Sequence, residues 1–217
     1  MKTLLELFQK YNNYEDVEYP SDKNSYHSYI EDVYEEYFSP YRNKKINLLE
    51  IGVSFSGSIR LWKDYFKNAQ IYGIDNFSCG EDYKNKSQDL ISGLVKNIKI
   101  ICGDAYDDNE SYDLPEFDII IDDGPHTLFT QMKCIEIYLP KLKTDGIMFI
   151  EDIIIDFDYD YEGEDLAQHP TMKKLIEKIP DNRYEYKIFD LRKNVIGRKG
   201  IPEQGRGDNV ILAIKSL

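Results

Sequence analysis

The sequence contains no long apolar run. No stretch approaches the roughly 20 apolar residues that a membrane-spanning helix requires. The N-terminal residues 1–6 become charged too early for a signal peptide. We therefore expect a cytoplasmic protein without a membrane partner.

Positive charge is scarce relative to negative charge. The 27 Lys and Arg residues face 40 Asp and Glu residues, which leaves a formal net charge of −13 at pH 7. Such a surface repels the phosphate backbone of nucleic acids. The composition therefore argues against a nucleic-acid partner.

Cysteine is scarce as well, and its spacing carries no motif. Cys79, Cys102 and Cys134 are an odd number, and no CxxC pair suggests a zinc site or a dithiol. We expect three reduced structural thiols. The sequence also lacks internal repeats and low-complexity linkers. Its 217 residues suffice for one substantial core, and we predict a single domain over residues 1–217.

Short apolar strands alternate with helical patterns along most of the chain. Helices are predicted over residues 26–38, 58–66 and 128–142, and buried strands over 46–51, 71–75, 98–102, 117–122 and 146–151. This alternation predicts a parallel sheet with helices on both faces. Alternating residues at 184–191 and 209–215 predict an antiparallel pair that completes the sheet. The predicted fold is α/β and Rossmann-like, with a mostly parallel seven-stranded sheet over 46–217 and a helical lid region over 1–45.

The turn after the first strand has the composition of a ligand-binding turn. Gly52 and Gly57 allow close approach of the backbone and positive φ, and the following helix offers free N–H groups. Their spacing, after the acidic Glu50, differs from the GxGxxG of dinucleotide-binding turns. Asp75 ends the second strand, where a carboxylate can accept hydrogen bonds from a ribose diol, and Asp104 follows the third. Taken singly, each residue is equally well explained as a turn or cap residue.

Acidic residues follow two further strands. Asp123 comes after the fourth strand, and Glu151 and Asp152 come after the fifth. Three carboxylates at neighbouring strand ends repel one another unless a cation compensates them, and an all-oxygen set suits Mg²⁺ first, with Mn²⁺ as an alternative. The competing interpretation is that these acids cap a helix and form a solvated turn.

Histidine is rare in this chain, and one of the three lies beside the acids. His126 follows Asp123 in the same loop, which suggests a general base for a hydroxyl nucleophile. Lys23 and His27 precede the aromatic helix and are candidates for closing a pocket. We expect His169 at the surface and a mobile loop over 159–164.

Several blocks of the sequence resemble the class I S-adenosylmethionine (SAM)-dependent methyltransferases, and within them the sugar O-methyltransferases of the macrocin and mycinamicin type. The matching blocks are residues 21–27, 49–53, 62–66, 71–75, 122–127 and 146–152. The resemblance implies a SAM site with Asp75 at the ribose and Asp104 near the adenine, and a divalent metal. The site residues it implies are Glu50, Gly52, Ser54, Gly57, Ser58, Asp75, Asp104 and Asp122 for the donor, Asp123, Glu151 and Asp152 for the metal, and His126 with Asp123 for catalysis.

The resemblance and the motifs together predict a metal-dependent O-methyltransferase. The expected acceptor is a sugar hydroxyl of a glycan, a nucleotide sugar or a glycosylated natural product. Two alternatives remain open: methylation of a catechol-like molecule on Mg²⁺, and a non-catalytic or NAD-binding Rossmann protein. The aromatic N-terminal helices are expected to pack on their own core or on a second subunit, so a homo-oligomer is possible.

Overall fold

The computed structural model describes residues 2–12, 18–107, 112–155, 166–180, 182–198 and 200–217. The chain divides into two units, Met1–Glu110 and Ser111–Leu217, which are described separately. The single domain predicted over 1–217 stays a prediction. The mobile loop predicted at 159–164 lies outside the described residues.

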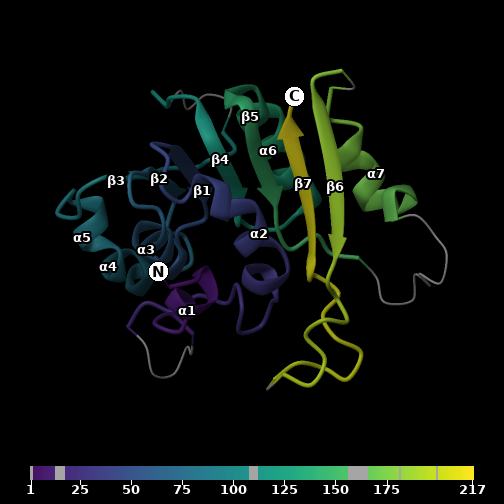
Figure 1. Ribbon diagram of the computed structural model, residues 1–217, viewed down its shortest axis with the longest axis horizontal. Helices are drawn as coiled ribbons and strands as arrows, with labels where there is room; N and C mark the ends of the chain where they lie inside the picture. The colour runs from purple at the N-terminus through teal and green to yellow at the C-terminus, as the bar shows by residue number, and fades with distance from the viewer. Residues whose placement is uncertain (1, 13–17, 108–111, 156–165, 181, 199) are drawn as a thin grey trace. The chain divides into compact units, whose positions relative to one another are not determined.

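The first unit contains three parallel strands in the order β3-β2-β1 (Figure 1). Their bounds are Asn47–Ile51 for β1, Gln70–Asp75 for β2 and Ile98–Cys102 for β3. Four of the five β1 residues are buried, as expected for a parallel strand covered on both faces. All three strands lie within one residue of the predicted bounds.

Helices of the first unit cluster around an aromatic core. The predicted helix over 26–38 begins only at Ile30, because residues 22–27 form turns in which the carbonyl of Asp22 accepts several backbone N–H groups. Tyr34 stacks on Phe38 with ring centroids 4.6 Å apart, and both rings meet Trp62 edge-on. The N-terminal aromatics therefore pack within their own unit. The helical segments are α1 Leu4–Phe8, η1 Ile30–Tyr34, α2 Glu35–Phe38, η2 Ser39–Tyr41, α3 Gly57–Tyr65, α4 Glu81–Lys86 and α5 Gln88–Ile91.

The second unit contains four strands in the order β4-β5-β7-β6 (Figure 1). The strands β4 (Phe117–Asp122) and β5 (Leu142–Ile150) are parallel. The strands β6 (Tyr184–Asp190) and β7 (Val210–Ser216) are antiparallel, and β7 also runs antiparallel to β5. The C-terminal antiparallel pair is therefore confirmed.

The helices of the second unit are α6 Leu128–Tyr138, η3 Leu139–Lys141, η4 Leu166–Gln168 and α7 Pro170–Ile176. The helix predicted over 128–142 is too long. Pro140 lies in the 3₁₀ turn η3 and has no N–H with which to continue an α-helix, so Leu142 already begins β5. The prediction that His169 lies at the surface is wrong. The residue is 7% exposed, and it caps α7 by accepting the Thr171 N–H at its Nδ1.

The seven strands, mostly parallel and ending in an antiparallel pair, agree with the predicted Rossmann-like fold class. Among the described residues, no helix combines the length and the apolar character needed to cross a bilayer. The cytoplasmic location stays a prediction.

Candidate functional site

The β1–α3 turn has an unusual backbone. Gly52 has φ of +88°, and Ser54 and Ser56 have φ of +48° and +65°. Positive φ is costly for residues with a Cβ and is often found at functional sites. The turn ends at α3, whose N-cap residue Ser56 makes no side-chain capping bond. The first N–H groups of α3 therefore have no cap from that side chain.

Asp75 holds this turn in place. Its Oδ2 accepts the backbone N–H groups of Val53 at 2.8 Å and Ser54 at 2.9 Å, while its Oδ1 accepts that of Phe77 at 2.6 Å. A carboxylate has about four acceptor positions, so capacity for a ribose hydroxyl remains after these three bonds. The structure therefore gives Asp75 an orienting function beside the predicted ribose contact.

Gly57 meets the chain's own backbone. A Cβ at this position would lie 2.2 Å from the Pro20 carbonyl oxygen and 2.8 Å from that of Tyr19. The glycine is therefore required for packing of the N-terminal segment, defined here as residues 18–27, on the start of α3. We predicted that a ligand would approach the backbone at Gly57, but the N-terminal segment fills the space beside this residue.

Glu50 is completely buried, with 0% exposure. Its Oε2 accepts the indole N–H of Trp62 at 3.0 Å, and its Oε1 lies 3.4 Å from the ammonium of Lys23, which is 1% exposed. Through these two interactions, the Glu50 carboxylate connects β1 to the N-terminal segment and to α3. Its direct contact with a donor stays a prediction.

The remaining predicted donor residues differ in exposure. Ser54 and Asp104 are exposed, and Asp104 accepts the N–H of Tyr106 at 2.9 Å. Ser58 is buried. Asp122, in the second unit, is 2% exposed and interacts with Cys134, so that burial first and the Asp122 charge second raise the pKa of this thiol.

An acid–histidine cluster, defined as Asp123, His126 and Asp152, lies in the second unit. One potential ligand atom from each residue lies within 4.8 Å of the other two. His126 Nε2 is 3.4 Å from Asp152 Oδ2 and 3.8 Å from Asp123 Oδ1. The side chains of Asp123, His126 and Asp152 are 22%, 30% and 10% exposed.

The strand register explains why these residues meet. Asp122 pairs with Ile150 in the parallel β4–β5 ladder, and the Glu151 N–H donates to the Asp122 carbonyl at 3.0 Å. Asp123 and Asp152 therefore leave the same sheet edge. His126 and Asp152 have φ of +56° and +53°, so both are held in a sparsely populated conformation.

Glu151 is 1% exposed and does not belong to the acid–histidine cluster. Its carbonyl accepts the side-chain amide of Gln131 at 3.0 Å, and Gln131 is itself 2% exposed on α6. The sequence analysis missed Gln131. Gln131 could have been found from the sequence, because it is a polar residue at helical spacing between the apolar residues Leu128 and Ile135.

The middle of the chain matches a known family. Residues 49–153, from β1 to just beyond β5, match the family described as methyltransferase domain. Residues 49–153 are therefore similar to methyltransferase domains, and they are called the methyltransferase domain below. The methyltransferase domain contains the β1–α3 turn, Asp75, Asp104 and the acid–histidine cluster.

Three known proteins show what the methyltransferase domain is similar to. An 8-demethyl-8-alpha-L-rhamnosyl tetracenomycin-C 2'-O-methyltransferase of Streptomyces olivaceus is 26% identical over 76% of this chain and 44% of its own. A mycinamicin VI 2''-O-methyltransferase of Micromonospora griseorubida is 32% identical over 55% of this chain and 30% of its own. The crystal structure of MycE methyltransferase from the mycinamycin biosynthetic pathway, in complex with Mg and SAH, superposes with a TM-score of 0.65 and 21% identity, over 99% of this chain and 55% of that one.

These similarities confirm the predicted resemblance to the mycinamicin type at the level of the family and the fold. The chain spans less than half the length of the two named relatives.

Proposed function

We propose that this chain transfers the methyl group of SAM to a sugar hydroxyl of a small-molecule glycoside. The observation that carries the proposal is the acid–histidine cluster at the end of β4 and β5 within a methyltransferase domain. The names of two relatives, which describe O-methylation of rhamnosyl tetracenomycin and mycinamicin, support a sugar-bearing acceptor.

The donor would bind at the β1–α3 turn. Gly52 exposes the backbone there, and the α3 N–H groups suit the carboxylate of the methionine moiety. Asp75 would accept the ribose hydroxyls, while Asp104 would lie near the adenine. The predicted donor-site residues also include Ser54, Ser58, Gly57 and Glu50 in the first unit and Asp122 in the second unit.

The acid–histidine cluster suits a divalent cation. Potential ligand atoms of two carboxylates and one imidazole lie within 4.8 Å of one another. The two carboxylates suit Mg²⁺ or Mn²⁺, which leaves the imidazole available as a base. Asp123 and Asp152 would hold the ion, and Glu151 remains a predicted ligand. A bound cation lowers the pKa of a coordinated hydroxyl.

His126 would remove the proton from the acceptor hydroxyl. Its Nε2 lies within 4 Å of two carboxylates, which orient the imidazole and stabilise the imidazolium formed after proton transfer. The hydroxyl oxygen then attacks the methyl carbon, the carbon–sulfur bond breaks, and the sulfonium becomes a neutral thioether. Alignment of the two reactants contributes to the rate by orientation alone.

A mass-spectrometric assay tests this proposal. The purified chain, SAM and a panel of glycosides are incubated with Mg²⁺ or with EDTA, and catechol serves as the alternative acceptor. We expect a mass gain of one methyl group on a glycoside, loss of that gain in EDTA and no methylation of catechol. Asp152→Asn should abolish transfer, whereas Glu185→Gln, an exposed β6 residue outside the acid–histidine cluster, should not.

The proposal fails if calorimetry shows no SAM binding, or if catechol is methylated and glycosides are not. Binding of NAD in place of SAM in a thermal-shift comparison would favour the nucleotide-binding alternative. The oligomeric state stays a prediction and is measured independently by light scattering.

A further inference from the structure

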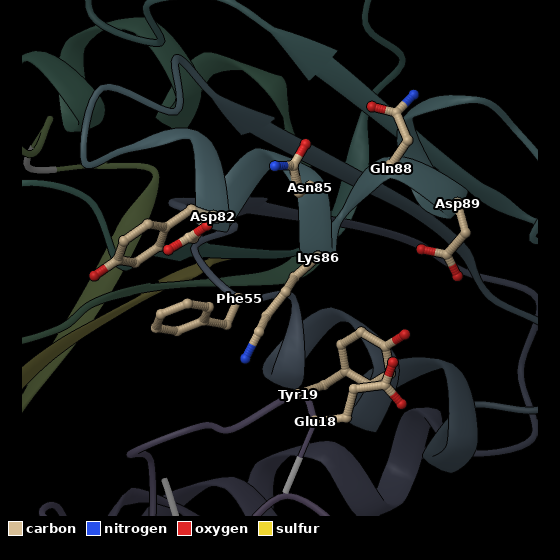
Figure 2. A pocket seen from close by; sticks show the side chains of 9 residues that line it. Glu18, Tyr19, Phe55, Asp82, Asn85, Lys86, Gln88 and Asp89 are labelled. Atoms are coloured by element: carbon tan, nitrogen blue, oxygen red, sulfur yellow. The ribbon is translucent and has the colours of Figure 1, made fainter. Parts of the chain in front are cut away.

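A cavity of about 860 Å³ lies in the first unit beside the tip of the β1–α3 turn (Figure 2). Its walls come from the N-terminal segment, from the turn and from α4 and α5. Gly52, Asp75 and Asp104 do not line it, and neither does the acid–histidine cluster. The residues that line the cavity are therefore different from the predicted donor-binding and proton-transfer residues, although Phe55 belongs to the β1–α3 turn.

Three aromatic rings form part of this cavity and are held in fixed positions. Phe55, at the turn, stacks on Tyr83 of α4 with centroids 4.1 Å apart and planes inclined by 19°. The guanidinium of Arg60 lies 3.7 Å from the ring centre of Tyr19. Arg60 in turn donates to Asp89 at 2.6 Å. The rings are thus oriented before any ligand arrives.

Polar side chains face the same space from α4 and α5. Asp82 and Asn85 come from α4, and Asp89 comes from the separate helix α5. Lys86 reaches from α4 toward the space between Phe55 and Tyr19 (Figure 2), and its ammonium is 4.8 Å from the Phe55 ring centre. The cavity thus combines ring faces with hydrogen-bond donors and acceptors.

The charges of the cavity select against anions. The carboxylates of Glu18, Asp82 and Asp89 line it, and the Lys86 ammonium also lines it. Asp89 is paired with Arg60, so the carboxylates of Glu18 and Asp82 outnumber the one remaining ammonium. Burial raises the pKa of Asp89, but the hydrogen bond and charge of Arg60 outweigh burial and lower it. This carboxylate therefore stays ionised at neutral pH. A phosphate-bearing ligand would be repelled here.

We propose that this cavity is a binding groove for an uncharged saccharide. A sugar ring offers apolar C–H faces, which pack on aromatic rings, and hydroxyls, which donate to carboxylates and exchange hydrogen bonds with amides. Arg60 covers one face of Tyr19, and Phe55 covers one face of Tyr83. The opposite faces of these two rings, together with the acidic and amide side chains, would provide both kinds of contact. Saccharide binding at this groove does not require methyl transfer, so it is measured separately from the proposed function.

Saturation-transfer NMR on the full chain tests the groove with maltotriose, cellotriose and methyl α-L-rhamnopyranoside as probes. We expect saturation transfer to at least one of these neutral sugars. Trigalacturonate, an anionic trisaccharide, and spermidine, a polycation, are the comparison probes. Absence of transfer to all three neutral sugars, or stronger binding of either charged probe, would overturn the proposal.

Variants then locate the binding. Tyr19→Ala should weaken the affinity about tenfold through loss of the ring face, while Tyr19→Phe, which keeps the ring, should bind within about threefold of the parent. Asn85→Ala, at an exposed position, gives a second test that does not disturb the core. Lys84→Ala on α4, outside the cavity lining, is the matched control. Unchanged affinity in both Tyr19→Ala and Asn85→Ala would contradict the assignment.

Discussion

The two units of this chain hold their carboxylates in opposite ways. In the first unit, Asp75 accepts three backbone N–H groups, and Glu50 is paired with a buried lysine and an indole. In the second unit, Asp123 and Asp152 converge with His126 within 4.8 Å. Converging like charges destabilise a fold unless a cation compensates them. The carboxylates of the first unit therefore stabilise the protein's own structure, whereas those of the second unit suit a bound ion.

The largest expected effect concerns the buried pair of the first unit. Glu50→Ala removes the carboxylate that lies 3.4 Å from the buried Lys23 ammonium and accepts the Trp62 indole N–H. It should lower the free energy of unfolding by about 3–5 kcal/mol. Urea denaturation followed by circular dichroism measures this loss. Lys10→Ala, which removes an exposed pair with Asp64, should cost no more than about 1 kcal/mol.

The double variant Lys23→Met with Glu50→Leu sharpens the test. It replaces the pair by apolar side chains of similar size and should recover most of the stability lost in Glu50→Ala. A Glu50→Ala variant as stable as the Lys10→Ala variant would show that the pair is not structurally important.

The second prediction concerns the base in the second unit. His126→Ala should lower kcat at least about 10²-fold, the usual contribution of a positioned proton acceptor, and leave the SAM dissociation constant unchanged. Single-turnover kinetics and calorimetry measure the two quantities. Full turnover in His126→Ala would remove its proposed catalytic function without affecting the donor site.

The third prediction tests whether the β1–α3 turn depends on the N-terminal segment. Gly57→Ala should destabilise the fold by about 1–3 kcal/mol, because the new methyl group overlaps the Pro20 carbonyl. Gly93→Ala, where no atom lies within 4 Å of the new Cβ but φ is +72°, controls for backbone strain alone. A smaller loss in Gly57→Ala than in Gly93→Ala would contradict the packing argument.

The smallest expected effect is on the stability of the second unit without metal. Asp123→Asn removes one of two converging charges and should raise the free energy of unfolding by up to about 0.5 kcal/mol in EDTA. Added Mg²⁺ should raise the Tm of the parent chain and have no such effect on Asp123→Asn. An equal Mg²⁺ response in both proteins would exclude Asp123 as a ligand.

The sequence predicted the strands well because their signal is local. Apolar runs at residues 98–102 and 117–122 match β3 and β4 residue for residue. The meeting of Asp123 and Asp152 was also predictable, since parallel neighbours end at the same sheet edge. The helix over 128–142 was predicted too long because periodicity outweighed Pro140 as a stop signal.

Contacts between distant segments could not be predicted. Nothing in the sequence pattern around Lys23 indicates that its ammonium reaches Glu50. The sequence alone also does not distinguish Gly57, which is needed for packing, from a glycine that contacts a ligand. His126 was predicted as a general base beside the acids, but the positive φ that orients it depends on the tertiary structure. Tyr19, Phe55 and Tyr83 line the groove but come from three separate segments of the chain. No local sequence motif therefore predicts it.

The pairing of Lys23 with Glu50 has a consequence for where this protein can be cut. A chain trimmed to start at Ile46 would keep all seven strands but bury an anion whose counter-ion had been deleted. The Trp62 indole would still donate to this carboxylate, but the compensating charge of Lys23 would be lost. A shortened chain would therefore need a neutral residue at position 50, and also a replacement for the rings of Tyr34 and Phe38 that pack on Trp62.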